Sequence, residues 1–521
     1  MSQIIAGVPS QEGKGTFTSV NPRTKQGGEL VFTNATTGEI DRAVRAAVEA
    51  YQEVRLYSAE KLAGFLEAVA SEIEAMGDVL LETADWETGL GLPRLQDERA
   101  RTTGQLRKFA TLLREGSYVD AIIDTATEAA PDIRRMLIPI GPVGVFSASN
   151  FPFAFAVAGG DTASAFAAGC PVVVKGHPSH PATSMLFAEA INSAIRQSGF
   201  PPGIFSLIQG TDVEVGLALV RHPQIEAIGF TGSLRAGRAI YDAAAARPRP
   251  IRVYAEMGSV NPVIFLPQAL KNRSEALADS LVNSITLGGG QFCTNPGLLF
   301  VVDSPEAQQF IAMVAERMTQ VEPCVLLNAQ IEGGLAKAVE TTRMFPFVEL
   351  LAGGKTQSDD HYTYASTVMQ VSSADFRAHA ALQEEHFGPV TVFVVCQSLD
   401  DLTDTLQILQ GNLTATIHAE ESEQDRASKL YHLLREKVGR LIWNGFPTGV
   451  AVVPGMVHGG PYPATTAAGT TSVGMTAIRR FMRPVAYQNM PDALLPDALK
   501  DANPLNLWRL VNWERTKDPV S

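Results

Sequence analysis

The stretch Glu226-Ala227-Ile228-Gly229-Phe230-Thr231-Gly232-Ser233-Leu234-Arg235-Ala236-Gly237 carries the signal that decides the fold. Its first five residues are typical of a buried strand, and Thr231–Ser233 predicts a tight glycine turn that opens a helix. A helix that begins after such a turn offers free N–H groups and a partial positive charge to a phosphate. The pattern is not G-x-G-x-x-G, so an ordinary strand–helix turn is equally compatible with it.

The same alternation extends to both sides of this stretch. Short apolar segments at 143–147, 172–175, 204–209, 226–230 and 252–255 predict strands, and the segments 182–196, 213–221 and 235–246 predict helices between them. Such alternation predicts a parallel sheet covered on both faces. Ligands of these sheets bind beyond the carboxyl ends of the strands. Asn150, Thr231–Ser233 and Glu256 follow predicted strands and Lys175 ends one, so we expect all of them to face one crevice.

A second alternating set predicts a second α/β domain. It begins at Val263 and includes predicted strands at 298–302, 390–395, 414–418 and 440–443 and a predicted helix at 305–320. Glu39–Leu113 reads as successive amphipathic helices that form a covering layer. Gly445–Gly474 is rich in Gly, Pro and Thr, and a loop of this length is expected to line or cover a site.

Composition limits the class of protein. With 521 residues, 45% of them hydrophobic and 19% charged, the chain suits two or three globular domains and not a disordered or fibrous protein. Four cysteines without a repeated short spacing argue against a disulfide framework or a zinc ribbon, and we expect free thiols, no bound metal and a cytoplasmic location. A net charge of −13 without a basic cluster gives no footprint for nucleic acid. We also expect no membrane association, since no apolar stretch is long enough to span one.

One cysteine stands apart from the other three. Cys293 ends the glycine-rich run Gly288-Gly289-Gly290-Gln291-Phe292-Cys293, which can give a thiol access to substrate and nearby N–H donors. Cys170, Cys324 and Cys396 lie in or beside apolar segments, where a cysteine behaves as a small hydrophobic residue.

Five motifs together resemble the aldehyde dehydrogenase superfamily. In chain order they are Asn150-Phe151-Pro152, Phe230-Thr231-Gly232-Ser233, Glu256-Met257-Gly258, Gly290-Gln291-Phe292-Cys293 and Glu384-Glu385-His386-Phe387-Gly388-Pro389. The resemblance extends from about Asn34 to Pro484. It implies an α/β fold with two doubly wound, Rossmann-like domains and a small β oligomerisation element. The implied ranges are 1–120 and 141–257 for dinucleotide binding, 258–475 for the catalytic thiol, and 121–140 and 476–521 for oligomerisation and bridging.

The resemblance also implies a role for each motif residue. Cys293 would attack an aldehyde carbon, Asn150 and the Cys293 N–H would stabilise the oxyanion, and Glu256 would activate the water that hydrolyses the thioester. The implied cofactor contacts are Lys175 at the adenine ribose, Gly232, Ser233 and Gly237 in the pyrophosphate turn, Glu385 at the nicotinamide ribose, and Pro178 and Phe387.

Each of these residues also has an ordinary structural interpretation. Asn150 suits a turn before Phe151-Pro152, Lys175 a solvated strand end, and Glu385 a surface acid. Glu256 is harder to explain without a function, because it follows an apolar strand and an interior carboxylate needs a partner.

Departures from the commonest pattern narrow the resemblance. Met257–Pro262, Met456–Ala464, Asp161–Ala165 and Arg479–Pro484 are similar to 2-oxoglutarate semialdehyde dehydrogenases and to NADP-dependent fatty aldehyde dehydrogenases. In that motif His458 would lie near the thiol and assist proton transfer, and a structural histidine in a Gly/Pro loop is about equally compatible. This resemblance favours the oxo-acid semialdehyde. A fatty aldehyde would need an apolar tunnel, to which Phe151, Phe153, Phe155, Phe292 and Phe446 are candidates.

Cofactor and partners follow from the same comparison. No glutamate follows Lys175-Gly176-His177-Pro178, which leaves room for the 2′-phosphate of NADP, although Asp212 and Glu214 oppose a phosphate. We expect NADP, with NAD also accepted, and a homodimer or homotetramer.

Two other functions compete with aldehyde oxidation. One is a non-catalytic binding protein, in which the thiol, base or oxyanion donor would be replaced. The other is acyl transfer to coenzyme A, which retention of Glu256 disfavours.

Overall fold

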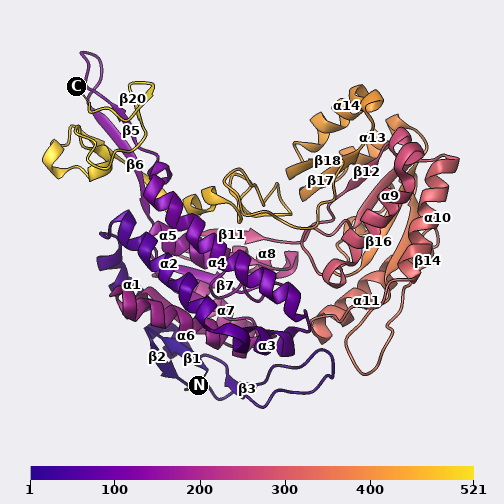
Figure 1. Cartoon of the computed structure of the whole chain (residues 1–521), viewed down its shortest axis with the longest axis horizontal. Coiled ribbons are helices and arrows are strands. Elements are labelled where there is room, and N and C mark those ends of the chain that lie inside the picture. Colours follow the sequence, from indigo (N-terminus) through magenta and orange to yellow (C-terminus); the bar gives the residue numbers. More distant parts are fainter. Residues whose placement is uncertain (1, 521) are drawn as a thin grey trace.

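Two α/β lobes and a projecting β arm make up the computed structural model, which describes residues 2–520 (Figure 1). The sheet of the first lobe has the strand order β11-β10-β7-β8-β9-β1-β2. Its parallel strands are β7 (Val143–Phe146), β8 (Val172–Lys175), β9 (Phe205–Ile208), β10 (Ala227–Thr231) and β11 (Arg252–Glu256). These strands confirm the predicted parallel sheet.

Two N-terminal strands extend this sheet and were not predicted. β1 (Gln3–Ile5) pairs antiparallel with β9, and β2 (Val8–Ser10) pairs antiparallel with β1. Strands of three residues are too short to show the apolar alternation by which a strand is recognised. Their position in the sheet therefore depends on tertiary pairing.

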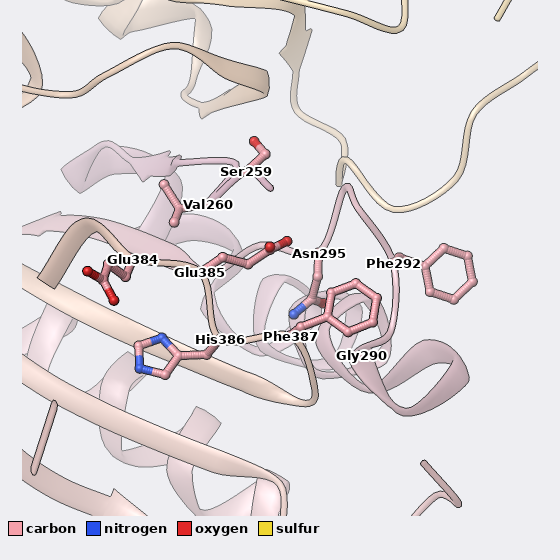
Figure 2. A pocket seen from close by; sticks show the side chains of 10 residues that line it. Ser259, Val260, Gly290, Phe292, Asn295, Glu384, Glu385, His386 and Phe387 are labelled. Carbon is pink, nitrogen blue, oxygen red and sulfur yellow. The ribbon is translucent and has the colours of Figure 1, made fainter. Parts of the chain in front are cut away.

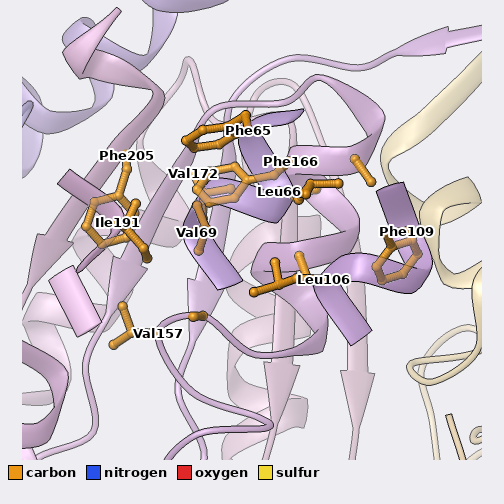
Figure 3. Packing of buried hydrophobic residues seen from close by; sticks show 14 of the residues in the cluster. Phe65, Leu66, Val69, Leu106, Phe109, Val157, Phe166, Val172, Ile191 and Phe205 are labelled. Atoms are coloured by element: carbon orange, nitrogen blue, oxygen red, sulfur yellow. The ribbon is translucent and has the colours of Figure 1, made fainter. Parts of the chain in front are cut away.

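Helices cover both faces of the first sheet. They are α1 (Thr37–Val54), α2 (Ala59–Ala75), α3 (Gly77–Thr88), α4 (Leu92–Glu115), α5 (Gly160–Ala168), α6 (Pro181–Ser198), α7 (Val213–Arg221) and α8 (Leu234–Ala245). Figure 3 shows the core between α2, α4 and the sheet, where the Phe65 and Phe166 rings meet at 5.3 Å. The buried faces of α1, α2 and α4 confirm the predicted helical layer.

The second lobe repeats the architecture with the order β14-β15-β16-β13-β12-β17-β18. Its strands are β12 (Val263–Phe265), β13 (Leu298–Val302), β14 (Glu349–Ala352), β15 (Thr367–Ser372), β16 (Val390–Cys396), β17 (Asn412–His418) and β18 (Val438–Trp443). β14 is antiparallel to its neighbour and the other strands are parallel. The helices are α9 (Pro267–Thr286), α10 (Pro305–Thr319), α11 (Ala329–Arg343), α12 (Ser373–Ala378), α13 (Leu399–Gln407) and α14 (Gln424–Leu434).

The arm is a five-stranded sheet that projects from the first lobe (Figure 1). β6 (Ile133–Pro139) pairs antiparallel with β19 (Met482–Gln488) over seven residues, and β5 (Ile122–Asp124), β20 (Arg509–Val511) and β21 (Glu514–Thr516) complete the sheet. β3 (Thr16–Phe17) and β4 (Phe32–Thr33) form a separate ribbon. Among residues 2–520, no helix has the length and apolar character needed to span a membrane.

The long loop 445–474 runs between the two lobes (Figure 1). Although it follows β18 of the second lobe, it is anchored on the first: the Met257 N–H donates to the Ala464 carbonyl at 2.8 Å, and Glu256 and Thr465 form a β-bridge. The loop thus brings its side chains to the carboxyl end of β11.

Candidate active site

The thiol turn is shaped by three consecutive glycines. Gly288, Gly289 and Gly290 have φ values of 58°, 68° and 68°, in the left-handed region that glycine adopts without strain. At Gly290 a Cβ atom would lie 2.2 Å from the Gly388 backbone, so only glycine allows this approach. Cys293, which follows, is half-buried, whereas Cys170 and Cys396 are fully buried, and all four cysteines are free. Access to solvent distinguishes Cys293 from these two buried thiols. Cys324 is exposed, so the prediction that it behaves as a hydrophobic residue beside an apolar segment was wrong.

Three reactive groups converge at this turn. Cys293 Sγ lies 3.4 Å from His458 Nε2, which lies 2.8 Å from Glu256 Oε1. The three groups come from three places in the fold: the thiol turn before β13, the carboxyl end of β11 and the loop 445–474. Ligand-type atoms of all three lie within 4.8 Å of one another. The structure therefore brings together the predicted nucleophile, the predicted base and the subfamily histidine.

The charge state of this cluster follows from burial and contact. Burial opposes ionisation of Glu256, but the adjacent His458 and the Ser472 hydroxyl outweigh it, so the pKa of the Glu256 carboxyl lies below its usual range. Burial, together with the neighbouring Glu256 carboxylate, raises the pKa of the Cys293 thiol well above its usual range. At neutral pH the site thus holds a carboxylate next to a protonated thiol, with the imidazole between them.

Asn150 lies next to the thiol turn and is buried. Its Nδ2 donates to the Gln291 carbonyl at 2.9 Å, which leaves the second N–H of the same amide for another acceptor. Arg94 holds this segment from the other side, since its Nη2 donates to the Asn150 carbonyl at 2.7 Å. The amide is thus fixed in place beside the thiol turn.

The predicted phosphate turn occupies the carboxyl end of β10. Ser233 caps α8 by accepting a hydrogen bond from the Ala236 N–H at 3.3 Å, and the Gly232 N–H donates to the Glu256 carbonyl at 3.0 Å. At Gly237 a Cβ atom would lie 2.6 Å from Met257 Sδ, so glycine allows α8 to pack closely against the strand end. The turn keeps the exposed helix N-terminus that the sequence predicts.

Lys175 ends β8, which is separated from β10 by β7, and Pro178 follows in the next loop. Burial lowers the pKa of Lys175 to about 8. Within residues 2–520 no acidic group offsets this burial, so the environment of Lys175 differs from that of the solvated strand end considered as the alternative. The side chain is positioned to donate to a polar ligand at this sheet edge.

Glu385 and Phe387 lie on the other side of the thiol turn, in a pocket that Gly290, Phe292 and Asn295 also line. Figure 2 shows Glu385 and Phe387 reaching toward this turn, whereas Glu384 and His386 point the opposite way. Burial raises the pKa of Glu385 to about 7. This environment differs from that of the surface acid considered as the alternative.

Two further residues support the cluster and were not predicted from the sequence. Ser472 Oγ donates to Glu256 Oε2. Asn261 Nδ2 donates to the carbonyls of Cys293 and Asn295 at 2.8 and 2.9 Å, and so fixes the thiol turn. In the sequence, Ser472 is only a polar residue inside a Gly/Pro/Thr-rich loop, and Asn261 is only an asparagine before Pro262.

The fold and the site define an oxidoreductase of the class that acts on aldehydes. The chain belongs to the aldehyde dehydrogenase family, whose model matches residues 8–462. It is 45% identical over 485 residues to alpha-ketoglutaric semialdehyde dehydrogenase 2 of Azospirillum brasilense, with 92% of each chain covered. It is 44% identical to alpha-ketoglutaric semialdehyde dehydrogenase of Acinetobacter baylyi over 526 aligned positions, with 99% of each covered.

Solved structures share the fold. One is a double mutant of betaine aldehyde dehydrogenase from Staphylococcus aureus in complex with NAD+, which superimposes with a TM-score of 0.82 at 20% identity, covering 94% of this chain and 97% of that one. The superposition confirms the predicted two-lobed α/β architecture with its β arm.

Proposed function

We propose that this chain oxidises 2-oxoglutarate semialdehyde to 2-oxoglutarate through a thioester on Cys293. Relatives with this activity in their names are 44% and 45% identical over nearly the whole chain. The observation that carries the mechanism is the contact of Cys293 Sγ and Glu256 Oε1 with one imidazole nitrogen, at 3.4 and 2.8 Å.

The first half of the reaction needs a thiolate. As the Cys293 sulfur attacks the aldehyde carbon, its proton passes to the His458–Glu256 pair, which is within reach. The new C–S bond turns the carbonyl oxygen into an oxyanion. The free N–H of the Asn150 amide and the Cys293 backbone N–H stabilise that charge, and each such donor contributes roughly 3 kcal/mol.

The second half releases the acid. When bound, a pyridine dinucleotide supplies the hydride acceptor for the carbon attached to sulfur, and a thioester remains. With the first proton held on His458, the Glu256 carboxylate takes a proton from water, the resulting hydroxide attacks the acyl carbon, and the C–S bond breaks. The departing thiolate recovers the proton from His458, and Glu256 releases its proton to solvent. The pKa of Glu256, held low by His458 and Ser472, keeps this group ionised for the task.

The residues at the strand ends suit such a dinucleotide. The α8 N-terminus behind Thr231–Ser233 would hold the pyrophosphate, Lys175 and Pro178 the adenosine, and Glu385 and Phe387 the nicotinamide side. A pyrophosphate explains why β10 ends in a glycine turn at an exposed helix start. We assign dinucleotide binding to residues 1–120 and 141–257 and the thiol to residues 258–475.

Within this cofactor class we favour NADP, with NAD also accepted. No acid follows Lys175 in the loop that would face the ribose, and the Asp212 carboxylate accepts a hydrogen bond from Asn34 Nδ2 at 2.7 Å. An acid occupied in this way is less available to a ribose hydroxyl.

The substrate and cofactor are tested together. Initial rates of NADPH and NADH formation should be measured on 2-oxoglutarate semialdehyde, glutarate semialdehyde and a long-chain aldehyde. We expect the highest kcat/KM for the oxo-acid with NADP. Preference for the long-chain aldehyde would assign the protein to fatty aldehyde oxidation. A requirement for coenzyme A would show acyl transfer in place of hydrolysis, and the absence of turnover on every aldehyde would support a binding protein.

We further propose a cytoplasmic homodimer or homotetramer that assembles through residues 121–140 and 476–521. The four free thiols suit a reducing compartment. The arm leaves Trp508 and Trp513 51% and 90% exposed, and tryptophan is enriched at protein interfaces. Native mass spectrometry of the full chain and of Trp513→Ser checks this proposal: the variant should shift toward monomer, and a monomeric full chain would contradict it.

A further inference from the structure

One face of helix α4 lies along the segment 150–155, which carries Asn150. Arg94, Glu98 and Arg101 share this face because they are four and three residues apart. Glu98 Oε1 accepts hydrogen bonds from the N–H groups of Phe153 and Ala154, both at 2.9 Å, and so clamps the segment that follows Asn150 to the helix. Two guanidinium groups flank this single carboxylate, which leaves the face with one uncompensated positive charge.

Arg101 carries that charge. Its Nη1 is buried and has no hydrogen-bond partner among residues 2–520. Arg94 Nη1 and Arg440 Nε are also buried without a partner, but each of these guanidinium groups donates through its other nitrogens. Arg94 donates to the Asn150 carbonyl, and Arg440 donates to the carbonyls of Pro447 and Gly449 at 2.7 and 3.0 Å. Arg101 as a whole is half-buried, and its buried Nη1 is costly to leave without a partner unless a ligand supplies one.

A row of contacts connects Arg101 to the reacting thiol. The guanidinium carbon lies 5.1 Å from the centre of the Phe155 ring, and that ring lies 6.3 Å from the His458 imidazole. His458 Nε2 in turn lies 3.4 Å from Cys293 Sγ. The negative charges of Glu98, of Cys293 when ionised and of Glu256 all act on Arg101, which places its charge in the field of the active site. The cation is therefore close to the reacting groups, and the Phe155 ring is a neighbour of both the guanidinium and the imidazole.

Aromatic rings form the wall along this row. Phe151 lies 5.3 Å from Phe155 and 5.2 Å from Phe292, both edge to face. These rings suit the methylene groups of a short aldehyde but offer no partner to a carboxylate. Arg101 is the charged group at the Phe155 end of this wall.

We propose that Arg101 binds the carboxylate of the substrate while the aldehyde carbon at the other end meets Cys293. This inference rests on the proposed function, since it names the group that recognises an oxo-acid semialdehyde. A guanidinium can bind a carboxylate with two parallel hydrogen bonds, and this fork fixes the orientation of the bound molecule. A long-chain aldehyde would leave the same guanidinium buried and unpaired. Arg101 is thus a specificity-determining residue.

The test compares Arg101→Met with Arg101→Lys, and both with the control Arg107→Met. Arg107 lies on the same helix but pairs with Glu74 on the exposed side at 2.5 Å. Each variant is assayed with 2-oxoglutarate semialdehyde and with pentanal, a neutral aldehyde of the same length. Inhibition of pentanal oxidation by 2-oxoglutarate reports carboxylate binding without turnover of an acid substrate.

For Arg101→Met we expect kcat/KM for the semialdehyde to fall about 10- to 100-fold, mainly through KM. Pentanal oxidation should stay within about twofold, and 2-oxoglutarate inhibition should weaken in parallel with the semialdehyde. Arg101→Lys should be intermediate, and Arg107→Met should match the wild type. Equal losses on both aldehydes, or unchanged inhibition, would overturn the role of Arg101. A wild type that prefers pentanal but is still inhibited through Arg101 would instead overturn the proposed substrate alone.

Discussion

At the residue scale, the proton on Cys293 decides how the site works. Burial and the facing carboxylate raise the pKa of this thiol, so a standing thiolate is disfavoured. The groups beside the thiol also allow it to react, because the Glu256 carboxylate and the His458 imidazole can accept the thiol proton as sulfur attacks. His458 makes this relay possible, since its Nε2 is in contact with both groups. A structural histidine was equally compatible with the sequence, and the geometry favours the relay.

The pKa of Glu385 yields a pH prediction. Burial raises it to about 7, so the group is mostly protonated at pH 6 and mostly ionised at pH 8. If the carboxylate accepts hydrogen bonds from ribose hydroxyls, cofactor affinity should rise through this window by up to about tenfold, the ratio of the ionised fractions. Fluorescence titration of NADPH at pH 6, 7 and 8 measures the effect. Glu385→Gln should remove this pH dependence of cofactor affinity. Glu384→Gln is the control and should keep it, because the Glu384 side chain points the other way in Figure 2. An unchanged pH dependence in Glu385→Gln would exclude the role of Glu385 as the ribose acceptor.

At the element scale, the connection between β11 and β12 holds the nucleophile. Asn261 lies in this connection with a φ of 43°, accepts from the Ser259 hydroxyl at 2.9 Å, and donates to the carbonyls of Cys293 and Asn295. The side chain therefore links the base-bearing strand end to the thiol turn. We regard it as a positioning residue.

Asn261→Ala tests this link. The change leaves two carbonyls without their donor, so we expect a loss of about 2–4 kcal/mol in the free energy of unfolding and a lower kcat. Urea denaturation and steady-state kinetics provide the two measurements. Asn272→Ala, an exposed position in α9, is the matched control and should change neither. A fully active and stable Asn261→Ala enzyme would contradict this role and show that the thiol turn keeps its conformation without the Asn261 side chain.

The sequence predicted the regular elements better than the connections. The apolar strands from β7 to β11 alternate with amphipathic helices, and this pattern depends only on local residues. The short strands β1 and β2 and the contacts of Ser472 and Asn261 depend on pairing between distant segments, which periodicity does not encode. Cys293, Glu256 and Asn150 were found through their motifs. Arg101, on a helix with many charges, had no motif to distinguish it.

At the scale of the whole molecule, the site exists only where the two lobes and their connecting loop meet. Glu256 belongs to the first sheet, Cys293 precedes a strand of the second, and His458 comes from the loop 445–474. The loop is anchored on the first lobe by its bridge to Glu256 although it follows the last strand of the second. The resemblance assigned this loop to the second domain, and its length predicted that it lines or covers a site. The folded arrangement adds that this site lies between the two lobes.

The most direct test of the account is the fate of the acyl group in Glu256→Gln. In a rapid-mixing experiment with 2-oxoglutarate semialdehyde and NADP, we expect one equivalent of NADPH per active site, followed by turnover at least about 100-fold slower than in the wild type. Peptide mass spectrometry should find the acyl adduct on Cys293, and Cys293→Ala should give neither burst nor adduct. Full steady-state turnover in Glu256→Gln, or an adduct on another residue, would contradict the assignment of base and nucleophile.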